Sequence, residues 1–317
     1  MSNCIANQYR ITKKLGKGSF GEVFQALDLQ TKDQVAIKLE PLTASHPQLQ
    51  YESRILRILE GVPGVPTIHN SGKDSQNTFM VIDLLGPSLE DLLNLSNRRM
   101  SLKTVLMLAG QLLNIIENIH NKNYIHRDIK PQNFLMGSGP AASFVYTIDF
   151  GLAKRFKDSQ TAQHLSFKQG KKLTGTARFV SVFTHMGMEQ SRRDDLEGLA
   201  YLFIYLLNGK LPWQDISAED KEEKYKKIFE VKSGMNVDKI CKGLPEEFKS
   251  FLLYARSLEF EECPDYGRIR ESFLQLFRKA GFCCDWVYDW TRIAVRKDSF
   301  GMEENGNGRV EYEEAKT

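Results

Sequence analysis

Long apolar runs are missing from this sequence of 317 residues. The longest strongly apolar stretch, Leu199–Leu207, is well short of the roughly 20 residues that a membrane-spanning helix needs. Met1–Lys14 also lacks the apolar core of a signal peptide. We therefore expect neither secretion nor integral association with a membrane, and we place the protein in the cytoplasm, with the nucleus as a second compartment.

Cysteine is scarce, and its pattern excludes a disulfide-stapled scaffold. The five cysteines are odd in number and show no Cys-x-x-Cys or Cys/His spacing of a zinc site, so we expect reduced thiols. Hydrophobic residues make up 41% of the chain and charged residues 26%, which excludes collagen-like and largely disordered chains. The length suits two domains, or one domain of two lobes.

Neither sign of charge is in strong excess, because 43 Lys and Arg against 40 Asp and Glu leave a net charge of +3. The distribution is nevertheless uneven. Leu152–Arg193 holds nine bases and two acids, a charge of +7, whereas Asp298–Thr317 holds six acids and two bases, a charge of −4. The positive excess of the body therefore lies in one segment.

Alternating apolar and polar residues in the first third predict an antiparallel sheet, with strands at Tyr9–Leu15, Glu22–Leu29, Gln34–Glu40 and Phe79–Leu85. An amphipathic helix is expected over 48–60. Gly86 and Pro87 follow the last strand and predict a lobe boundary. Beyond it the apolar period is helical, and we expect helices around 105–119, 196–207, 218–231, 246–257 and 265–279.

A glycine-rich segment, Gly16–Gly21, lies between the first two predicted strands. Glycines let the backbone approach phosphates closely and present its N–H groups to them. A Rossmann dinucleotide site would continue into a helix, whereas this sequence continues as the strand Glu22–Leu29. The segment alone is therefore compatible with a phosphate-binding loop or with a flexible hairpin that binds nothing.

Two charged residues stand on faces that are otherwise apolar. Lys38 ends the Val-Ala-Ile-Lys run of a predicted strand, and Glu52 shares one helix face with Ile55 and Leu56. Each alone is compatible with an exposed charge at the edge of an element. Because a buried lysine needs an anionic partner, the two together predict a Lys38–Glu52 pair that could contact a phosphate.

Further polar residues follow in two loops. Asp128, Lys130 and Asn133 lie in a loop that Pro131 keeps from becoming helix. A carboxylate there could deprotonate a hydroxyl, a lysine could neutralise a transferring phosphoryl group, and an asparagine oxygen could bind Mg²⁺. Asp149 directly follows a short apolar strand and offers a second oxygen ligand for such a cation.

In this order, the motifs resemble those of the eukaryotic protein kinase family, whose phosphoryl-transfer chemistry supplies the roles given below. The resemblance narrows to the casein kinase 1 branch through Leu84–Leu92, Leu173–Arg178 and Glu189–Glu197, and through Ser181–Phe183 in place of an Ala-Pro-Glu motif. It covers the chain from about residue 9 to residue 290.

The resemblance implies an α+β protein kinase fold of two lobes, an N-terminal antiparallel sheet with one helix and a larger, mainly helical C-terminal lobe. We expect an N-terminal extension over 1–8, a kinase domain over 9–293 with lobes at about 9–85 and 86–293, and a disordered acidic tail over 294–317. The implied reaction is transfer of the γ-phosphate of ATP to Ser or Thr of acidic or phospho-primed proteins.

The family assigns a role to each matching residue. Asp128 would be the catalytic base, Lys130 would steady the γ-phosphate, and Asn133 and Asp149 would bind Mg²⁺. Lys38 would contact the α and β phosphates. ATP would be bound by Leu15, Gly16, Gly18, Ser19, Gly21, Val23, Ala36, Lys38, Glu52, Ile82, Asp83 and Leu85.

The resemblance also gives the basic segment a use, as two anion sites for acidic or phosphorylated protein substrates. Arg127, Lys154 and Lys171 match one site, and Arg178 and Lys224 match the other. Clustered Arg and Lys suit phosphate and carboxylate groups, although a solvated basic surface without a ligand is the alternative. Nucleic acid is not expected, because no aromatic residues suited to base stacking accompany these charges.

Three residues depart from the family pattern: Gln132 replaces Asp, Asp215 replaces Gly and Phe183 replaces Asn. A carboxylate at position 215 would repel phosphate, so we expect a weaker dependence on primed substrates. Asp194 and Asp195 start a predicted helix. A carboxylate there is either a helix cap or, as in the family, a brace for the catalytic loop, and both interpretations are open.

Two other classes of function compete with this interpretation. A pseudokinase scaffold usually lacks at least one catalytic residue, and all of them are present here. A kinase of small molecules is disfavoured by the peptide-facing segment Gly175–Arg178, in which Thr176 fits the Ser/Thr preference of the family. We further expect a monomer that is active without phosphorylation of its activation loop.

Overall fold

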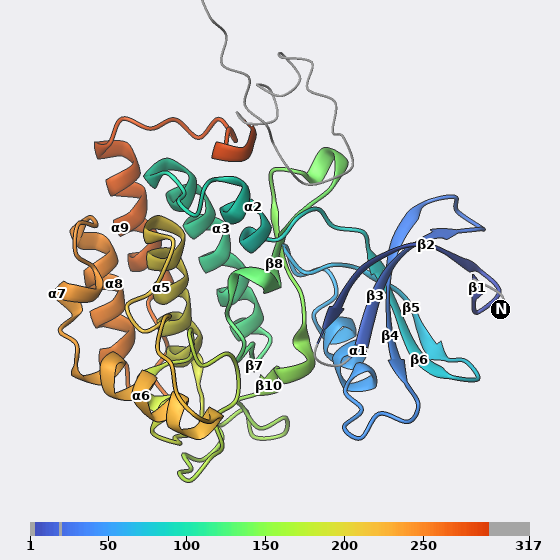
Figure 1. The fold of residues 1–317 in the computed structure, drawn as a ribbon, viewed down its shortest axis with the longest axis horizontal. Coiled ribbons are helices and arrows are strands. Elements are labelled where there is room, and N and C mark those ends of the chain that lie inside the picture. The colour runs from blue at the N-terminus through green and yellow to red at the C-terminus, as the bar shows by residue number, and fades with distance from the viewer. Residues whose placement is uncertain (1–3, 19–20, 292–317) are drawn as a thin grey trace, which may run out of the picture.

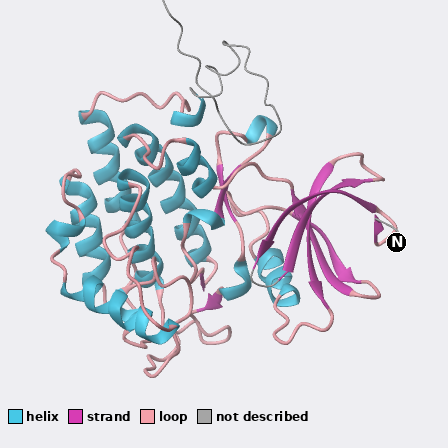
Figure 2. Ribbon diagram, viewed as in Figure 1, coloured by secondary structure: helices cyan, strands magenta, loops and turns pink. Residues whose placement is uncertain are grey.

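The computed structural model describes residues 4–18 and 21–291, which form two lobes joined by one segment (Figures 1 and 2). The acidic tail expected over 294–317 lies outside the described residues, and so does Ser19. Within the described part of the chain, no helix combines the length and the apolar character needed to cross a membrane. The expected two-lobed α+β kinase fold is confirmed.

The N-terminal lobe is an antiparallel sheet with the strand order β1-β2-β3-β4-β6-β5. The strands are β1 (Cys4–Ile5), β2 (Tyr9–Gly18), β3 (Gly21–Asp28), β4 (Gln34–Pro41), β5 (Ile68–Lys73) and β6 (Asn77–Asp83). Because β4 pairs with β3 on one side and with β6 on the other, it lies inside the sheet. Its residues Val35 and Ile37 are accordingly buried in a small core with Phe79 and Val81 of β6.

Two of these strands, β1 and β5, escaped the sequence prediction. The β5 sequence, Ile-His-Asn-Ser-Gly-Lys, has one strong strand-forming residue and no apolar alternation. The strand lies at the edge of the sheet and pairs with β6. Its conformation is therefore set by backbone pairing to a neighbour that lies later in the sequence, which a local pattern does not reveal.

The helix α1 (Leu49–Ile58) lies between the sheet and the C-terminal lobe (Figure 1). Its first backbone N–H groups are satisfied from β4, because Oε1 of the buried Glu40 accepts from Gln48 N at 2.8 Å and from Leu49 N at 3.3 Å. A carboxylate at this end also suits the helix dipole. This contact fixes the start of α1 and so places Glu52, one turn later, on the buried face.

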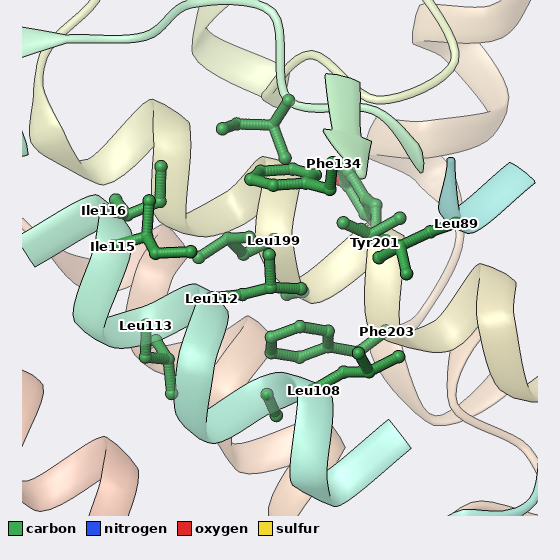
Figure 3. Close-up of a cluster of buried hydrophobic side chains, with 14 of the residues drawn as sticks. Leu89, Leu108, Leu112, Leu113, Ile115, Ile116, Phe134, Leu199, Tyr201 and Phe203 are labelled. Carbon is green, nitrogen blue, oxygen red and sulfur yellow. The ribbon is translucent and has the colours of Figure 1, made fainter. Parts of the chain in front are cut away.

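The C-terminal lobe is mainly helical and contains α2 (Leu89–Leu95), α3 (Leu102–Asn121), α4 (Val182–His185), α5 (Arg192–Asn208), α6 (Lys221–Gly234), α7 (Val237–Ile240), α8 (Glu246–Ser257) and α9 (Tyr266–Lys279). The helix α5 is buried from Arg192 to Leu207 and packs against α3 and α8. Figure 3 shows Leu108 and Leu112 of α3 beside Leu199 and Phe203 of α5. Truncating a side chain such as Leu199 to alanine would cost about 2–5 kcal/mol of stability.

The segment after β6 enters the C-terminal lobe beside the hairpin of β8 (Phe134–Met136) and β9 (Val145–Thr147). Gly86 N donates to the carbonyl oxygen of Met136 at 2.8 Å. A Cβ on Gly86 would lie 2.9 Å from the carbonyl oxygen of Gly137, so glycine is required for this close approach. The contact fixes the linker between the lobes against the wall of the cleft.

Candidate active site

A cleft of about 1110 Å³ lies between the lobes and is lined from both sides. It brings together most of the residues predicted from the sequence, namely Leu15, Gly16, Val23, Ala36, Lys38, Glu52, Ile82, Leu85, Lys130, Asn133, Asp149, Arg178 and Lys224. Thr176 and Trp213 also line it. One cavity therefore joins the predicted nucleotide site to the predicted site for the protein substrate.

The glycine-rich segment forms the turn between β2 and β3. Gly18 pairs with Gly21 at the end of this hairpin. A Cβ on Gly21 would collide with the carbonyl oxygen of Leu39 in β4, so the packing of the strands alone requires this glycine. A Cβ on Gly16 would meet no atom within 4 Å, and Gly16 lines the cleft. The packing of the strands thus does not explain the small size of Gly16.

Asp83, which we expect to bind ATP, forms hydrogen bonds with residues that do not line the cleft. Its N–H donates to the carbonyl oxygen of Thr67 at 3.2 Å, and its Oδ2 accepts from Thr67 N at 2.7 Å. Its Oδ1 lies 2.8 Å from Nε2 of His69. The N–H and the carboxylate of Asp83 are therefore engaged away from the cleft, in contrast to Leu85, which lines it.

The predicted pair of Lys38 and Glu52 is present. Nζ of Lys38 lies 2.7 Å from Oε2 of Glu52 and 3.4 Å from Oδ1 of Asp149. Lys38 comes from β4, Glu52 from α1, and Asp149 from the segment that follows β9. This contact ties the sheet, the helix and the C-terminal lobe to one ammonium group.

The protonation states at this contact follow from burial and from the neighbouring charges. Burial opposes the charged form of Lys38, but Glu52 and Asp149 outweigh it and raise the pKa of the lysine. Burial also opposes ionisation of Asp149, yet the Lys38 charge holds the pKa of this carboxyl below its usual value. Burial raises the pKa of Glu52 despite the opposing charge of Lys38. Lys38 is thus charged and faces an ionised Asp149.

Asp128 lies directly behind the cleft and is bonded to residues that line it. Its Oδ2 accepts from Nζ of Lys130 at 2.5 Å and from Nδ2 of Asn133 at 3.2 Å. Its Oδ1 accepts from the hydroxyl of Thr176 at 2.8 Å. A single turn of 3₁₀ helix, Pro131–Asn133, closes this loop. The arrangement gives Asp128 one oxygen beside a cation and the other toward the peptide-facing segment.

Uncommon backbone conformations gather at the same place. Arg127 and Asp149 have φ values of 68° and 66°, in the left-handed region that non-glycine residues seldom adopt. Gly175 has a φ of 101°, and a Cβ there would collide with the carbonyl oxygen of Arg127. Conformations of this kind persist only where the surrounding structure enforces them, and they cluster at functional sites.

The two open interpretations of Asp194 and Asp195 each apply to one residue. Asp194 completes a capping box, because its Oδ2 accepts from Ser191 N at 2.7 Å at the start of α5, and its Oδ1 also accepts from the hydroxyl of Ser181. Asp195 contacts the catalytic loop, because it accepts from His126 N at 2.7 Å and from Arg127 N at 2.9 Å. The structure therefore separates two adjacent carboxylates that the sequence could not distinguish.

The residues present suit a nucleotide with a divalent cation. Nδ2 of Asn133 is used by Asp128, which leaves its Oδ1 as the atom that a cation would meet. The Asp149 carboxylate lies in the same cleft, and oxygen ligands are those that Mg²⁺ prefers. Val23, Ala36 and Ile82 give the N-terminal half of the cleft an apolar wall that suits an adenine ring.

The two predicted anion sites differ in the structure. Lys154 and Lys171 both contact the carboxylate of Glu189, at 2.8 Å and 3.4 Å. Nε of Arg127 donates to the carbonyl oxygen of Leu152 at 2.6 Å. The first site thus already contains a carboxylate. Arg178 and Lys224, the second site, line the cleft itself.

Two departures from the family pattern now have a place. Gln132 lines the cleft beside Asn133. The ring of Phe183 lies under the guanidinium group of Arg193, 3.7 Å from the ring centroid to the guanidinium carbon. This stacking makes Phe183 part of the packing between α4 and α5.

Sequence reasoning missed three residues that contact the site or its supports. The sequence offered a signal for Glu189, because this residue is one of only two acids in the +7 segment and could be expected to pair with its bases. Tyr51, whose hydroxyl donates to the carbonyl oxygen of Ala153 at 2.8 Å, had none. Lys232 is one of several lysines in α6, and nothing in its spacing marks it as buried.

A comparison with known protein families agrees with this geometry. The family model described as the protein kinase domain matches residues 9–259, which is most of the chain. Members of this family transfer a phosphoryl group from ATP, with a divalent metal, to protein substrates. The chain therefore belongs to the protein kinase family.

Proposed function

We propose that this protein kinase is a casein kinase 1-like enzyme that uses ATP and Mg²⁺ to phosphorylate Ser and Thr of acidic or phospho-primed proteins, without needing phosphorylation itself. The observation that carries this proposal is the 2.8 Å hydrogen bond from Thr176 Oγ1 to Asp128 Oδ1. It connects the segment that faces the peptide to the residue in the position of the base.

Asp128 acts as the base in this mechanism. A substrate hydroxyl beside its Oδ1 gives up its proton as the hydroxyl oxygen bonds to the γ-phosphorus and the bond to ADP breaks. Lys130, 2.5 Å from the other carboxylate oxygen, neutralises charge on the transferring group. Lys38 binds the α and β phosphates. Asn133 and Asp149 would hold Mg²⁺, which would supply further charge neutralisation.

The Thr176 contact supports a preference for Ser and Thr over Tyr. It draws the peptide-facing segment close to Asp128. The hydroxyl of Ser or Thr is next to its own backbone and reaches the base from a peptide held at this distance. A tyrosine hydroxyl lies much further from its backbone and would need a more distant peptide.

The basic side chains support a preference for acidic or phosphorylated substrates. Glu189 already neutralises part of the charge of Lys154 and Lys171. Arg178 and Lys224 line the same cleft as Lys130 and Asn133, which bond to Asp128. No described carboxylate forms an ion pair with Arg178 or Lys224. The pair Arg178 and Lys224 is therefore the better receptor for an anion close to the phosphorylated residue.

Contacts within the chain support activity without phosphorylation. The Lys38–Glu52 pair holds α1 to the sheet, and the hydrogen bond from Tyr51 to Ala153 holds it to the C-terminal lobe. Lys154, which follows the Asp149-Phe150-Gly151 sequence, forms an ion pair with Glu189. The positions that a phosphate would organise thus already have partners within the chain.

The catalytic domain is proposed to extend beyond residue 259, where the family model ends, to about residue 293. The hydroxyl of Tyr266, in α9, lies 2.5 Å from Nδ1 of the buried His120 in α3. The other ring nitrogen of His120 lies 2.9 Å from Asp195. The helix α9 therefore supports the residue that contacts the catalytic loop and belongs to the same unit.

The test uses three peptides that share one acidic sequence and differ only in a single acceptor, Ser, Thr or Tyr. We expect the enzyme to phosphorylate the Ser and Thr peptides at least about tenfold faster than the Tyr peptide. Equal or faster use of the Tyr peptide would contradict the proposed specificity. Pretreatment with a phosphatase should leave the rates unchanged, and loss of activity would refute independence from phosphorylation.

A further inference from the structure

Lys232, in α6, is completely buried although it lies outside the catalytic centre. Its ammonium group donates to the carbonyl oxygens of Val180 at 2.6 Å, Ala177 at 3.1 Å and Arg178 at 3.4 Å. Lys232 forms no ion pair with a carboxylate among the described residues. A buried charge of this kind is stabilised only if its hydrogen-bonding capacity is used, and here three N–H donors meet three carbonyls.

Aromatic rings complete the site. Nζ of Lys232 lies 4.8 Å from the ring centroid of Tyr201 and 5.0 Å from that of Trp213, which suits cation–π attraction. Nε1 of Trp213 donates to the carbonyl oxygen of Arg178 at 2.8 Å. The side chains of Lys232 and Trp213 therefore both donate to the carbonyl oxygen of Arg178.

The carbonyls that Lys232 holds belong to the wall of the cleft where the protein substrate is expected. Thr176, immediately before them, bonds to Asp128, and Arg178 lines the cleft as part of the second anion site. The residues that follow, Ser181–Phe183, take the place of the Ala-Pro-Glu motif of other kinases. The backbone of residues 177–180 is fixed from behind by α6.

We propose that Lys232 is a positioning residue that holds the backbone of residues 177–180 in the conformation that receives the protein substrate. The inference rests on the proposed function, because it assigns the peptide to this wall. It makes α6 a determinant of substrate affinity, although its buried lysine touches neither ATP nor the substrate. Loss of the ammonium group removes a donor from each of the three carbonyls, of which that of Arg178 keeps only Trp213, and lets the segment move.

The kinetic test replaces Lys232 and measures KM for an acidic Ser peptide, KM for ATP and kcat. In Lys232→Met we expect KM for the peptide to rise about tenfold or more, while KM for ATP changes by less than about twofold. Lys232→Arg, which keeps charged donors, should recover part of the affinity. Lys226→Met, on the exposed side of the same helix, is the matched control and should behave as wild type.

A second measurement keeps the inference separate from catalysis and from gross misfolding. Hydrogen–deuterium exchange of the full chain should become faster in Lys232→Met within residues 174–182 and stay unchanged in α3. Lys232→Gln, with two N–H donors, provides an intermediate if the Met variant does not fold. Absence of peptide phosphorylation in wild type would contradict the proposed function alone, since the exchange result still tests Lys232.

Two results would overturn the role of Lys232. One is a folded Lys232→Met variant with wild-type KM for the peptide and unchanged exchange in residues 174–182. The other is a uniform loss, in which KM for ATP, kcat and exchange throughout the C-terminal lobe change together. That second pattern describes a residue needed only for stability.

Discussion

The hydroxyl of Tyr51, in α1, donates a 2.8 Å hydrogen bond to the carbonyl oxygen of Ala153, two residues after the Asp149-Phe150-Gly151 sequence. The adjacent residue, Glu52, pairs with Lys38. Two neighbouring side chains of one helix therefore reach the two lobes of the molecule. This relationship explains how contacts within the chain hold the helix in position.

Removal of the Tyr51 hydroxyl tests this explanation. We expect Tyr51→Phe to lower kcat severalfold and the free energy of unfolding by about 1 kcal/mol, because the Ala153 carbonyl loses its partner. Tyr146→Phe is the control, since the Tyr146 hydroxyl makes no hydrogen bond among the described residues. Steady-state kinetics and urea unfolding measure the two effects. A wild-type kcat in Tyr51→Phe would show that the hydrogen bond to Ala153 does not support activity.

The adjacent aspartates of α5 should respond differently to the same substitution. In Asp195→Asn, the carboxylate that accepts from the N–H groups of His126 and Arg127 becomes a neutral amide. We therefore expect kcat to fall at least about tenfold and the free energy of unfolding to fall by about 3 kcal/mol. Asp194→Asn, the matched neighbour, should keep most of kcat because Asp194 caps a helix. Equal losses in kcat would contradict the separate roles.

Asp194 also predicts a dependence of stability on pH. Burial raises the pKa of this carboxyl to about 7, from an ordinary value of 3.8. The protonated form is therefore favoured in the folded state, and its stabilising effect is complete below the unfolded pKa and lost as the pH rises through 7. Relative to Asp194→Asn, wild type should lose about 2 kcal/mol between pH 5 and pH 8 in urea unfolding. A difference that stays constant over this range would contradict the raised pKa.

Lys232 predicts a pH dependence of substrate affinity. Burial lowers its pKa to about 7, Glu197 of α5 favours the charged form, and Arg256 of α8 opposes it. His185 of α4 also faces it, and burial and Lys232 lower the pKa of this ring to about 3, so His185 is neutral throughout. The Tyr201 hydroxyl, whose pKa burial raises well above its ordinary value of 10, also stays neutral.

A neutral amine has two N–H donors for three carbonyls, so KM for an acidic peptide should rise in wild type as the pH increases from about 6.5 to 8.5. The carboxylates of such a peptide do not titrate in this range. Lys232→Arg remains charged and should show a flat profile. Because Asp194 titrates in the same range in both proteins, a rise that is identical in wild type and Lys232→Arg would assign the effect to another group.

Asp215 bears on the choice between acidic and primed substrates. Its carboxylate is exposed and lies 3.4 Å from Nζ of Lys210, a contact too solvated to neutralise it fully. We expect Asp215→Gly to increase the ratio of rates on primed and acidic peptides severalfold at low salt, where charge repulsion is least screened. Asp33→Gly, in the turn between β3 and β4, is the control for lost surface charge. An unchanged ratio would count against the repulsion.

Local signals explain which parts of this molecule were predictable. The strands β2, β3, β4 and β6 and the helix α1 follow from short-range apolar periods, and the motif residues that line the cleft follow from their spacing along the chain. The strand β5 and the separate roles of Asp194 and Asp195 depend on contacts between distant segments. The burial of Lys232 likewise depends on carbonyls more than 50 residues away, as the separations of 52 to 55 show.

Basic charge was an incomplete signal. The +7 segment places Lys154 and Lys171 together, yet composition did not show that Glu189 sits between them. The net charge of a segment counts its residues without their pairing. The structure shows that Arg178 of this segment lines the cleft together with Lys224, which lies outside the segment.

Substitution of Asp128 tests whether the cleft catalyses phosphoryl transfer with this residue as the base. Wild type and Asp128→Asn are incubated with γ-labelled ATP, Mg²⁺ and casein, and labelled protein is counted after separation from nucleotide. We expect transfer to Ser and Thr of casein by wild type and a loss of at least about a thousandfold in Asp128→Asn. No transfer by folded wild type, as from a scaffold without activity, or transfer that survives the substitution would contradict it.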